Sequence, residues 1–404
     1  MLPRRVAVTG LGVISALGHD TASFWEALRA GRSGIAPIET VNMTGFRFRN
    51  GAEVRAYDPA RHFESAQLDV LDRFAQFALI AARQAIHDSG IVFTPELRAR
   101  TAVITGSSLG GQSTQDAQFV EIYRRNSTRV HPLTIPRTMA NAAASHISME
   151  FGISGPAFTL STACSSANHA IGQAFWMVRN GAAEVAITGG SEAPFSYGLL
   201  RAWEAMRVIA PDTCRPFSRD RRGMILGEGS AMLVLEPLER ARARGARVHA
   251  EIVGFGMSSD AGHITTPSAD GPARAMQAAL CDAATPSESV GYINAHGTGT
   301  VNNDSTETQA IRLTFGSHAD KLAVSSTKSM HGHALGAAGA LEAVATLLAL
   351  RCGILPPTAN FTAPDPACDL DVIPNQPRPA QVEYALSNSF AFGGLNAVLA
   401  FRRA

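Results

Sequence analysis

Residues 158–175 read FTLSTACSSANHAIGQAF and place Cys164 where a short strand meets a helix. The pattern predicts a strand over 157–160 that runs into a turn over 161–164, followed by a helix over 165–179. Small neighbouring residues leave room for a substrate beside the backbone. At a helix N-terminus, the dipole and the free N–H groups favour a thiolate and can stabilise an oxyanion. We therefore interpret Cys164 as a nucleophile, and the other four cysteines as ordinary structural residues.

Strand-then-helix units recur on both sides of this segment. Further buried strands are predicted at 101–105, 184–188, 248–254 and 291–295. Such alternation indicates βαβ units in which helices cover buried sheets. The second half has a similar alternation of predicted strands and helices to the first, although no exact sequence repeat is present. For 404 residues we expect an α/β fold with an N-terminal half at 1–245 and a C-terminal half at 246–404.

The composition indicates a soluble enzyme, with 46% hydrophobic and 17% charged residues. A net charge of +1 provides no overall attraction to nucleic acid or membrane, so we expect neither as a partner. The five cysteines form no CxxC pair, which disfavours a disulfide framework or a zinc site and predicts a cytoplasmic location. The apolar stretch 334–352 contains Glu342 and is interpreted as a buried helix. The cysteines are Cys164, Cys214, Cys281, Cys352 and Cys368.

A second segment, INAHGTGTVNNDSTE over 293–307, ends a predicted strand with His296. A histidine at a strand terminus, among small residues, is well placed to donate to a reacting carbonyl. Thr298 and Thr300 supply hydroxyls for a polar substrate arm. Taken alone, His296 would be a turn residue in a loop.

Two more segments follow. SSTKSMHGHALGAAGALEA, over 325–343, sets Lys328, His331 and His333 before or at the start of a predicted helix over 332–352, which carries Glu342. No third ligand accompanies the two histidines at a suitable spacing, so a catalytic metal is not expected. LSNSFAFGGLN, over 386–396, is a strand and a glycine-rich turn, which suits either a mobile flap or a tight hairpin with core aromatics.

Together, TACSS, NAHGTGT, STKSMHGHALGAAGA and NSFAFGG resemble the elongating β-ketoacyl-acyl carrier protein synthases. The resemblance extends from VAVTGLGVISALG near the N-terminus to the last strand. It implies the thiolase fold, in which two similar halves stack as a five-layered αβαβα sandwich, usually in a dimer. It also implies decarboxylative Claisen condensation of an acyl thioester with a malonyl thioester, both carried on the phosphopantetheine of an acyl carrier protein.

The resemblance assigns a role to each motif. Cys164 would take the acyl chain, with its own N–H and that of Phe392 as the oxyanion hole. His296 and His333 would stabilise the enolate formed when malonyl loses carbon dioxide, so no cofactor is expected. Lys328 and Glu342 would orient the histidines.

The remaining roles concern substrate binding and support. Thr298 and Thr300 would hold the pantetheine arm, Phe392 would gate the acyl pocket and Leu109 would line it. Asp304 is assigned a supporting role, and Phe390 and Thr265 belong to the substrate site. A structural monovalent cation is expected near Glu342, Ser387 and Asn388.

The chain departs from the family pattern at several positions. His331 stands where threonine is common, and we expect it to be solvated and idle. Ala391 and Leu395 replace a glycine and a threonine of the turn, which predicts a stiffer gate. Asp69 lies where many relatives carry basic residues for the carrier. The substitutes we expect there are Arg73, Arg124, Arg125 and Arg129. These departures fit a specialised polyketide or polyene pathway as well as fatty-acid elongation.

Three alternatives use the same fold. A non-catalytic chain-length factor would normally lack the nucleophile, whereas Cys164, His296 and His333 are all present. A degradative thiolase needs a second cysteine near the C-terminus, and NSFAFGG has none. A starter-unit synthase would have asparagine where His333 stands. The expected assembly is a homodimer, or a heterodimer with a chain-length-factor homologue.

Overall fold

The computed structural model describes residues 3–404 and contains one sheet of ten strands, in the order β10-β9-β13-β14-β8-β1-β7-β6-β4-β5. The five strands from the first part of the chain are β1 (Val6–Ser15), β4 (Thr101–Gly106), β5 (Ala157–Leu160), β6 (Val185–Glu192) and β7 (Gly229–Pro237). The five from the second part are β8 (Ala250–Ser259), β9 (Val290–Asn294), β10 (Ala323–Ser325), β13 (Tyr384–Ala391) and β14 (Leu395–Arg403).

Both sets of five strands have the same topology. Counted along its own set, each sheet has the order 3-2-4-5-1. In each set, strand 4 pairs in parallel with strand 2, which pairs in parallel with strand 3. Strand 5 pairs antiparallel with strands 4 and 1. The two sets join where β1 and β8 pair over three residues each, Val6–Val8 against Ala250–Ile252. The expected boundary after residue 245 falls in the connection between α10 and β8.

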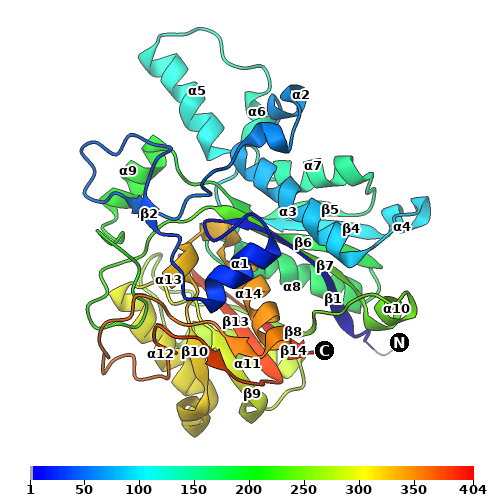
Figure 1. Ribbon diagram of the computed structural model, residues 1–404, viewed down its shortest axis with the longest axis vertical. Coiled ribbons are helices and arrows are strands. Elements are labelled where there is room, and N and C mark those ends of the chain that lie inside the picture. Colours follow the sequence, from blue (N-terminus) through cyan, green and yellow to red (C-terminus); the bar gives the residue numbers. More distant parts are fainter. Residues whose placement is uncertain (1–2) are drawn as a thin grey trace.

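Helices form the other layers, above, between and below the two sets of strands (Figure 1). On the first set lie α3 (Arg73–Ser89) and α7 (Ala142–Phe151), and on the second set lies α11 (Asp270–Asp282) with α12 (Val301–Phe315) beside it. Between them, α8 (Ser166–Arg179) and α14 (Ala338–Cys352) contact both sets and each other. This arrangement confirms the predicted α/β fold with five layers of the thiolase type.

The remaining elements are short or peripheral. Figure 1 shows α5 projecting from the body of the molecule. The α-helices are α1 (Thr21–Arg29), α2 (Ser65–Leu68), α4 (Pro95–Ala99), α5 (Gln112–Arg124), α6 (Thr134–Thr138), α9 (Tyr197–Ala205), α10 (Leu238–Ala243) and α13 (Lys328–His331). Single 3₁₀ turns cover Pro59–Arg61, Ser287–Ser289, Gly316–Lys321 and Leu335–Ala337. Two small ribbons pair β2 (Ala36–Pro37) with β3 (Asn50–Gly51), and β11 (Ile354–Leu355) with β12 (Arg378–Pro379).

Close backbone packing explains the glycines of the first strand. A Cβ at Gly10 would lie 2.0 Å from the carbonyl oxygen of Ala85, and one at Gly12 would lie 1.9 Å from that of Ala81. Both contacts are far inside van der Waals distance, so β1 rests against α3 only because these positions carry no side chain.

The central helix α14 is largely apolar and is covered by strands of both sets. All residues from Ala338 to Leu350 are buried. Within residues 3–404, the 335–352 stretch is the only helical segment long and apolar enough to cross a membrane, and 89% of it is buried inside the fold. The prediction of a buried helix is confirmed. The predicted start at 332 was wrong, because Gly332 and Leu335 take left-handed φ angles of +68° and +47° and break the chain into α13, a 3₁₀ turn and α14.

Candidate active site

One cavity of about 280 Å³ brings together the cysteine and the two histidines from three separate segments. Cys164 reaches it from the turn between β5 and α8, and His296 from the end of β9. His333 enters from the break between α13 and α14. Each residue therefore lies where a regular element ends, so its side chain points into the cavity while the elements fix its backbone.

The turn before Cys164 is strained. Ala163 has a φ of +50°, which side chains other than glycine rarely adopt. Hydrogen bonds from Ser165 N to Thr162 O (3.2 Å) and from Ser166 N to Ala163 O (3.2 Å) hold it. The helix begins at Ser166, directly after the turn. This conformation places the Cys164 sulfur at the helix entrance, as expected for a nucleophile presented on a sharp strand-to-helix turn.

The resting state of Cys164 differs from the expected thiolate. Burial raises the pKa of its thiol to about 12, while the Lys328 charge opposes this shift and Glu192 adds to it. The partial charge of the helix end is smaller than the cost of desolvating a thiolate in this cavity. Cys164 is therefore a neutral thiol at physiological pH, and a role as nucleophile would require the thiol proton to leave as the sulfur attacks.

The two histidine rings lie close together and nearly perpendicular. The ring centroids of His296 and His333 are 5.4 Å apart with planes at 84°. The N–H of Leu335 donates to Nδ1 of His333 at 3.1 Å, which leaves the proton of a neutral imidazole on Nε2. Nδ1 of His296 has no hydrogen-bond partner within residues 3–404. The His296 backbone is fixed by its N–H, which donates to Glu307 Oε1 at 2.8 Å.

Both imidazoles are held neutral. Burial lowers the pKa of His296 and of His333 well below 6.5, and the Lys328 ammonium lowers each further. A neutral imidazole with its proton on Nε2 can donate a hydrogen bond without carrying charge, which suits an oxygen that becomes negative during the reaction.

A buried ion pair supplies the positive charge. Lys328 donates to Glu342, and both side chains are fully inaccessible to solvent. Burial raises the pKa of Glu342 to about 7 even though Lys328 acts to lower it. Neither side chain lines the cavity, so the pair acts on Cys164 and the histidines through its field.

Three buried oxygens beside this pair have no partner among the described residues. They are Glu342 Oε2, Ser387 Oγ and Asn388 Oδ1, and Asn388 is oriented by its own Nδ2, which donates to Glu307 at 3.2 Å. Unpaired buried acceptors are costly, and a set made only of oxygens suits a hard monovalent cation. The chemistry of these residues therefore fits the structural cation that the family resemblance implies.

His331 does not lie in solvent, as the sequence suggested. Its side chain is fully buried, with Nδ1 against the carbonyl of Gly332 at 2.8 Å and Nε2 against Thr327 Oγ1 at 3.0 Å. A carbonyl can only accept, so Nδ1 carries the proton and Nε2 accepts from the threonine. Burial lowers the pKa of His331 to about 3. The imidazole is a neutral link that holds the end of α13 just ahead of His333.

The remaining predicted substrate residues divide between two places. Thr298, Thr300, Phe390 and Phe392 line the cavity with Thr265, and the two hydroxyls of Thr298 and Thr300 lie 2.9 Å apart. Leu109 packs instead in the apolar cluster that surrounds Cys164. That cluster also contains Phe195, Leu200, Met224, Leu335 and Ala391.

The turn after Phe390 is a tight hairpin. Ala391 pairs with Leu395 at the end of β13 and β14, and Gly394 N donates to Ala391 O at 3.0 Å. Gly393 and Gly394 have φ angles of +83° and +69°. Between them and Ala391 stands Phe392, which stacks on Trp203 at a centroid distance of 6.3 Å.

Sequence reasoning missed Glu192. Its buried carboxylate accepts from Ser107 Oγ (3.0 Å), Ser108 N (2.8 Å), Leu109 N (3.2 Å) and Gly336 N (3.0 Å). It thus joins the loop that presents Leu109 to the turn after His333. An acidic residue that ends a wholly buried strand, as Glu192 does in β6, was the available signal.

Comparisons with known proteins show which chains this one is similar to. Residues 3–241 match the family model "Beta-ketoacyl synthase, N-terminal domain", and residues 249–362 match "Beta-ketoacyl synthase, C-terminal domain". The chain is 48% identical over 402 residues to "Nodulation protein E" of Rhizobium sp. (strain N33), with 100% of both chains covered.

Two further similarities bear on the activity. The chain is 43% identical to "3-oxoacyl-[acyl-carrier-protein] synthase 2" of Synechocystis sp., covering 99% of this chain and 98% of that one. It superposes on a solved structure described as "The ishigamide ketosynthase/chain length factor" with a TM-score of 0.95 and 39% identity, covering 100% of both chains.

The buried His331 should make folding sensitive to acid. The unfolded imidazole takes up a proton near pH 6.5, whereas the folded one does not until about pH 3. Stability is therefore lost as the pH falls below 6.5, by about 2 kcal/mol for this residue between pH 7 and pH 5. In urea denaturation, the free energy of unfolding of the His331→Thr variant should fall by about that much less than the wild type over this interval. An identical pH dependence of the two proteins would contradict the neutral, buried state of His331.

Proposed function

The chain belongs to the beta-ketoacyl synthase family and is an enzyme that condenses acyl thioesters in fatty-acid or polyketide biosynthesis, and we propose that Cys164, His296 and His333 carry out the reaction. The observation that carries this proposal is that the three side chains, which come from separate segments, line one cavity. A non-catalytic chain-length factor, the alternative on this fold, does not require such a set.

In the first step, Cys164 Sγ attacks the carbonyl carbon of an acyl-carrier thioester. The bond from that carbon to the carrier sulfur breaks, and the proton from Cys164 ends on the carrier thiol. Because burial raises the pKa of Cys164 to about 12, the proton leaves as the thiol attacks. The N–H groups of Cys164 and Phe392 are proposed to hold the oxyanion.

In the second step, malonyl thioester loses carbon dioxide and leaves an enolate. His296 and His333, both neutral, donate hydrogen bonds to its oxygen. The enolate carbon attacks the acyl-cysteine carbonyl and expels the Cys164 thiolate, which takes up one proton. The products are a 3-oxoacyl thioester on the carrier, carbon dioxide and the restored thiol. We propose both steps without a cofactor, and the absence of one stays a prediction.

Lys328 and Glu342 are proposed to set the protonation states of the groups in the cavity. The Lys328 ammonium opposes protonation of the two histidines and partly offsets the rise in the pKa of Cys164 that burial causes. A monovalent cation held by Glu342, Ser387 and Asn388 would satisfy the three oxygens that lack hydrogen-bond partners among the described residues. Asp304 supports the same region by fixing the loop that carries Thr298 and Thr300.

The substrate arm is proposed to run past Thr298, Thr300 and Thr265 to Cys164. Beyond the sulfur, the apolar cluster with Leu109 and Ala391 offers a place for the acyl chain. The similarity to a nodulation protein and to a 3-oxoacyl synthase supports either fatty-acid or specialised polyketide metabolism. A cytoplasmic location stays a prediction.

Carrier docking is proposed at the rim of the cavity. Arg207 and Arg222 are exposed there, and neither forms an ion pair within residues 3–404. Arg73, one of the expected substitutes, is not available because its guanidinium is bound to the buried Glu228 at 2.7 Å. The other three expected arginines, Arg124, Arg125 and Arg129, are exposed on or just beyond α5, and none of them lines the cavity.

A second chain of this fold is proposed to cover β5 and α5. The strand β5 is the last of the sheet, pairs only with β4, and exposes Phe158. The segment over 119–135, which includes part of α5, exposes large apolar side chains, which isolated proteins rarely leave in contact with water. These are Phe119, Val120, Tyr123, Val130, Leu133 and Ile135. The partner is a copy of this chain or a chain-length-factor homologue.

The Cys164→Ala variant should retain its fold and lose acyl transfer. Intact-protein mass spectrometry after incubation with acyl-carrier protein should show an acyl adduct on the wild type and none on the variant. Since Cys214 is also buried and does not line the cavity, Cys214→Ala is the matched control and should still be acylated. An adduct on the Cys164→Ala protein would refute the assignment.

The His333→Ala variant should still be acylated at Cys164 but should release carbon dioxide roughly 10²–10⁴ times more slowly, because one donor to the enolate oxygen is lost. The measurement is release of labelled carbon dioxide from malonyl-carrier. Release at the wild-type rate would remove His333 from the decarboxylation step.

Reversal of charge at the rim should weaken carrier binding. The Arg222→Glu variant should raise KM for acyl-carrier protein about tenfold, more so at low salt, and leave kcat unchanged. Arg219→Glu, an exposed arginine that does not line the cavity, is the control and should change KM little. Equal effects of the two substitutions would argue against docking at the rim.

A further inference from the structure

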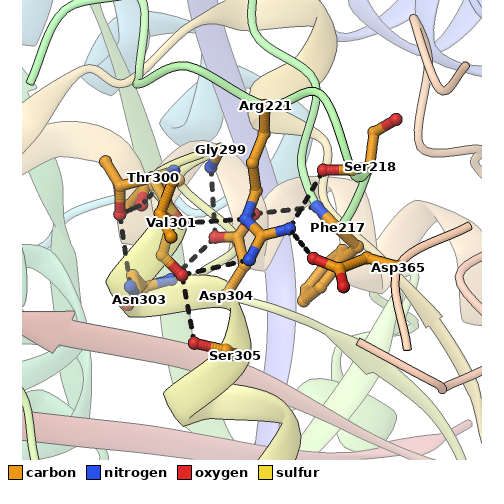
Figure 2. A network of polar contacts seen from close by, with 12 residues as sticks. Phe217, Ser218, Arg221, Gly299, Thr300, Val301, Asn303, Asp304, Ser305 and Asp365 are labelled. Atoms are coloured by element: carbon orange, nitrogen blue, oxygen red, sulfur yellow. Dashed lines mark hydrogen bonds and ion pairs between the residues drawn. The ribbon is translucent and has the colours of Figure 1, made fainter. Parts of the chain in front are cut away.

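Arg221 does not line the cavity, but it is hydrogen-bonded to residues that do. Figure 2 shows the polar contacts around its guanidinium. Only 3% of its side chain is exposed. It is enclosed by three segments that are distant in sequence: its own loop over 217–223, the turn over 298–303 that begins α12, and the stretch over 362–365. Burying a charged guanidinium costs free energy, so its hydrogen-bond partners should explain why it is buried.

The guanidinium donates to all three segments. Nε donates to the carbonyl of Thr300 at 3.2 Å, and Nη2 donates to that of Val301 at 3.1 Å. Nη1 donates to Ser218 O at 3.0 Å and to the carboxylate of Asp365. These acceptors lie around one planar fork, a geometry that a lysine ammonium cannot reproduce.

Asp304 completes the clamp from the other side. Its fully buried carboxylate lies 3.7 Å from Arg221 and accepts the N–H groups of Phe217 (2.8 Å) and Gly299 (3.1 Å). It also accepts from Asn303 Nδ2 at 3.1 Å. The pair therefore holds both the carbonyls and the N–H groups of the turn over 298–303, and ties that turn to the loop of the first half of the chain.

The clamped turn is the part of the wall that meets a substrate arm. Thr298, Thr300, Val301 and Asn303 line the cavity. The Thr300 hydroxyl both contacts Thr298 and caps α12 by accepting from Asn303 N at 3.3 Å. Opposite them, Gly223 N donates to Gly299 O at 3.0 Å. A shift of this turn would displace both threonine hydroxyls, whereas Cys164 and His333 lie on other segments and the His296 N–H is held separately by Glu307 at 2.8 Å.

We propose that Arg221 is a positioning residue that sets the affinity of the enzyme for the outer half of a phosphopantetheine arm by fixing the turn over 298–303. The inference rests on the proposed function, since it concerns how the same cavity binds its thioester substrates. Arg221 acts through Thr298 and Thr300, and it touches neither the acyl group nor the reacting sulfur.

The test compares two acyl donors that differ only in arm length. One is an acyl-pantetheine thioester, and the other is the acyl N-acetylcysteamine thioester, which lacks the outer half of the arm. For Arg221→Lys, which keeps the charge beside Asp304, KM for the long donor should rise about tenfold with kcat unchanged. Acylation of Cys164 by the short donor should proceed at the wild-type rate. The matched control is Arg219→Lys, an exposed residue of the same loop, which should leave both donors unaffected.

A second variant, Asp365→Ala, tests the same proposal if Arg221→Lys folds poorly. Asp365→Ala removes the carboxylate that accepts from Arg221 Nη1 and should raise KM for the long donor about threefold, again without effect on the short one. An unchanged KM for the long donor, or an equal loss with both donors, would overturn the positioning role. A wild-type protein that is acylated by neither donor would instead overturn the proposed function.

Discussion

The buried ion pair between Lys328 and Glu342, which lies between the two sets of strands, is the interaction around which this site is arranged. Removing either partner would leave the other as an uncompensated charge in the interior, which costs several kcal/mol. The pair spans the break between α13 and α14, because Lys328 belongs to the short helix and Glu342 to the long one. The segment that carries His333 is therefore held at both ends by one interaction.

Burial and this charge act together on the groups that line the cavity. The histidines stay neutral because both desolvation and the ammonium disfavour a second positive charge. The thiol stays protonated because desolvation outweighs the same ammonium. Cys164 and the two histidines are therefore uncharged at rest, and in the proposed reaction charge develops on the substrate oxygen. Such a site limits side reactions with water or oxidants.

The sequence predicted most of what depends on local pattern. The strand-to-helix turn at Cys164, the strand end at His296 and the alternating halves all follow from periodicity and small residues, and the structure shows them. It did not predict features set by distant partners. The helix expected from residue 332 is broken, because His333 is bonded to Ile225 in another segment (N to O, 2.7 Å). Arg73 looked like a surface charge, yet Glu228, which comes 155 residues later, binds it. His331 and Glu192 are buried by elements that no local pattern reveals.

The two halves of the chain share one strand order, and the site is built from the same connection in each half. Cys164 follows the third strand of the first set and precedes α8, while Lys328 and His333 follow the third strand of the second set and precede α14. These two connections occupy equivalent places in their halves, and they meet in the central layer. The two connections carry different side chains, a cysteine in one and a lysine and a histidine in the other. Neither half alone supplies all the side chains that line the cavity, so the cavity exists only where the two halves meet.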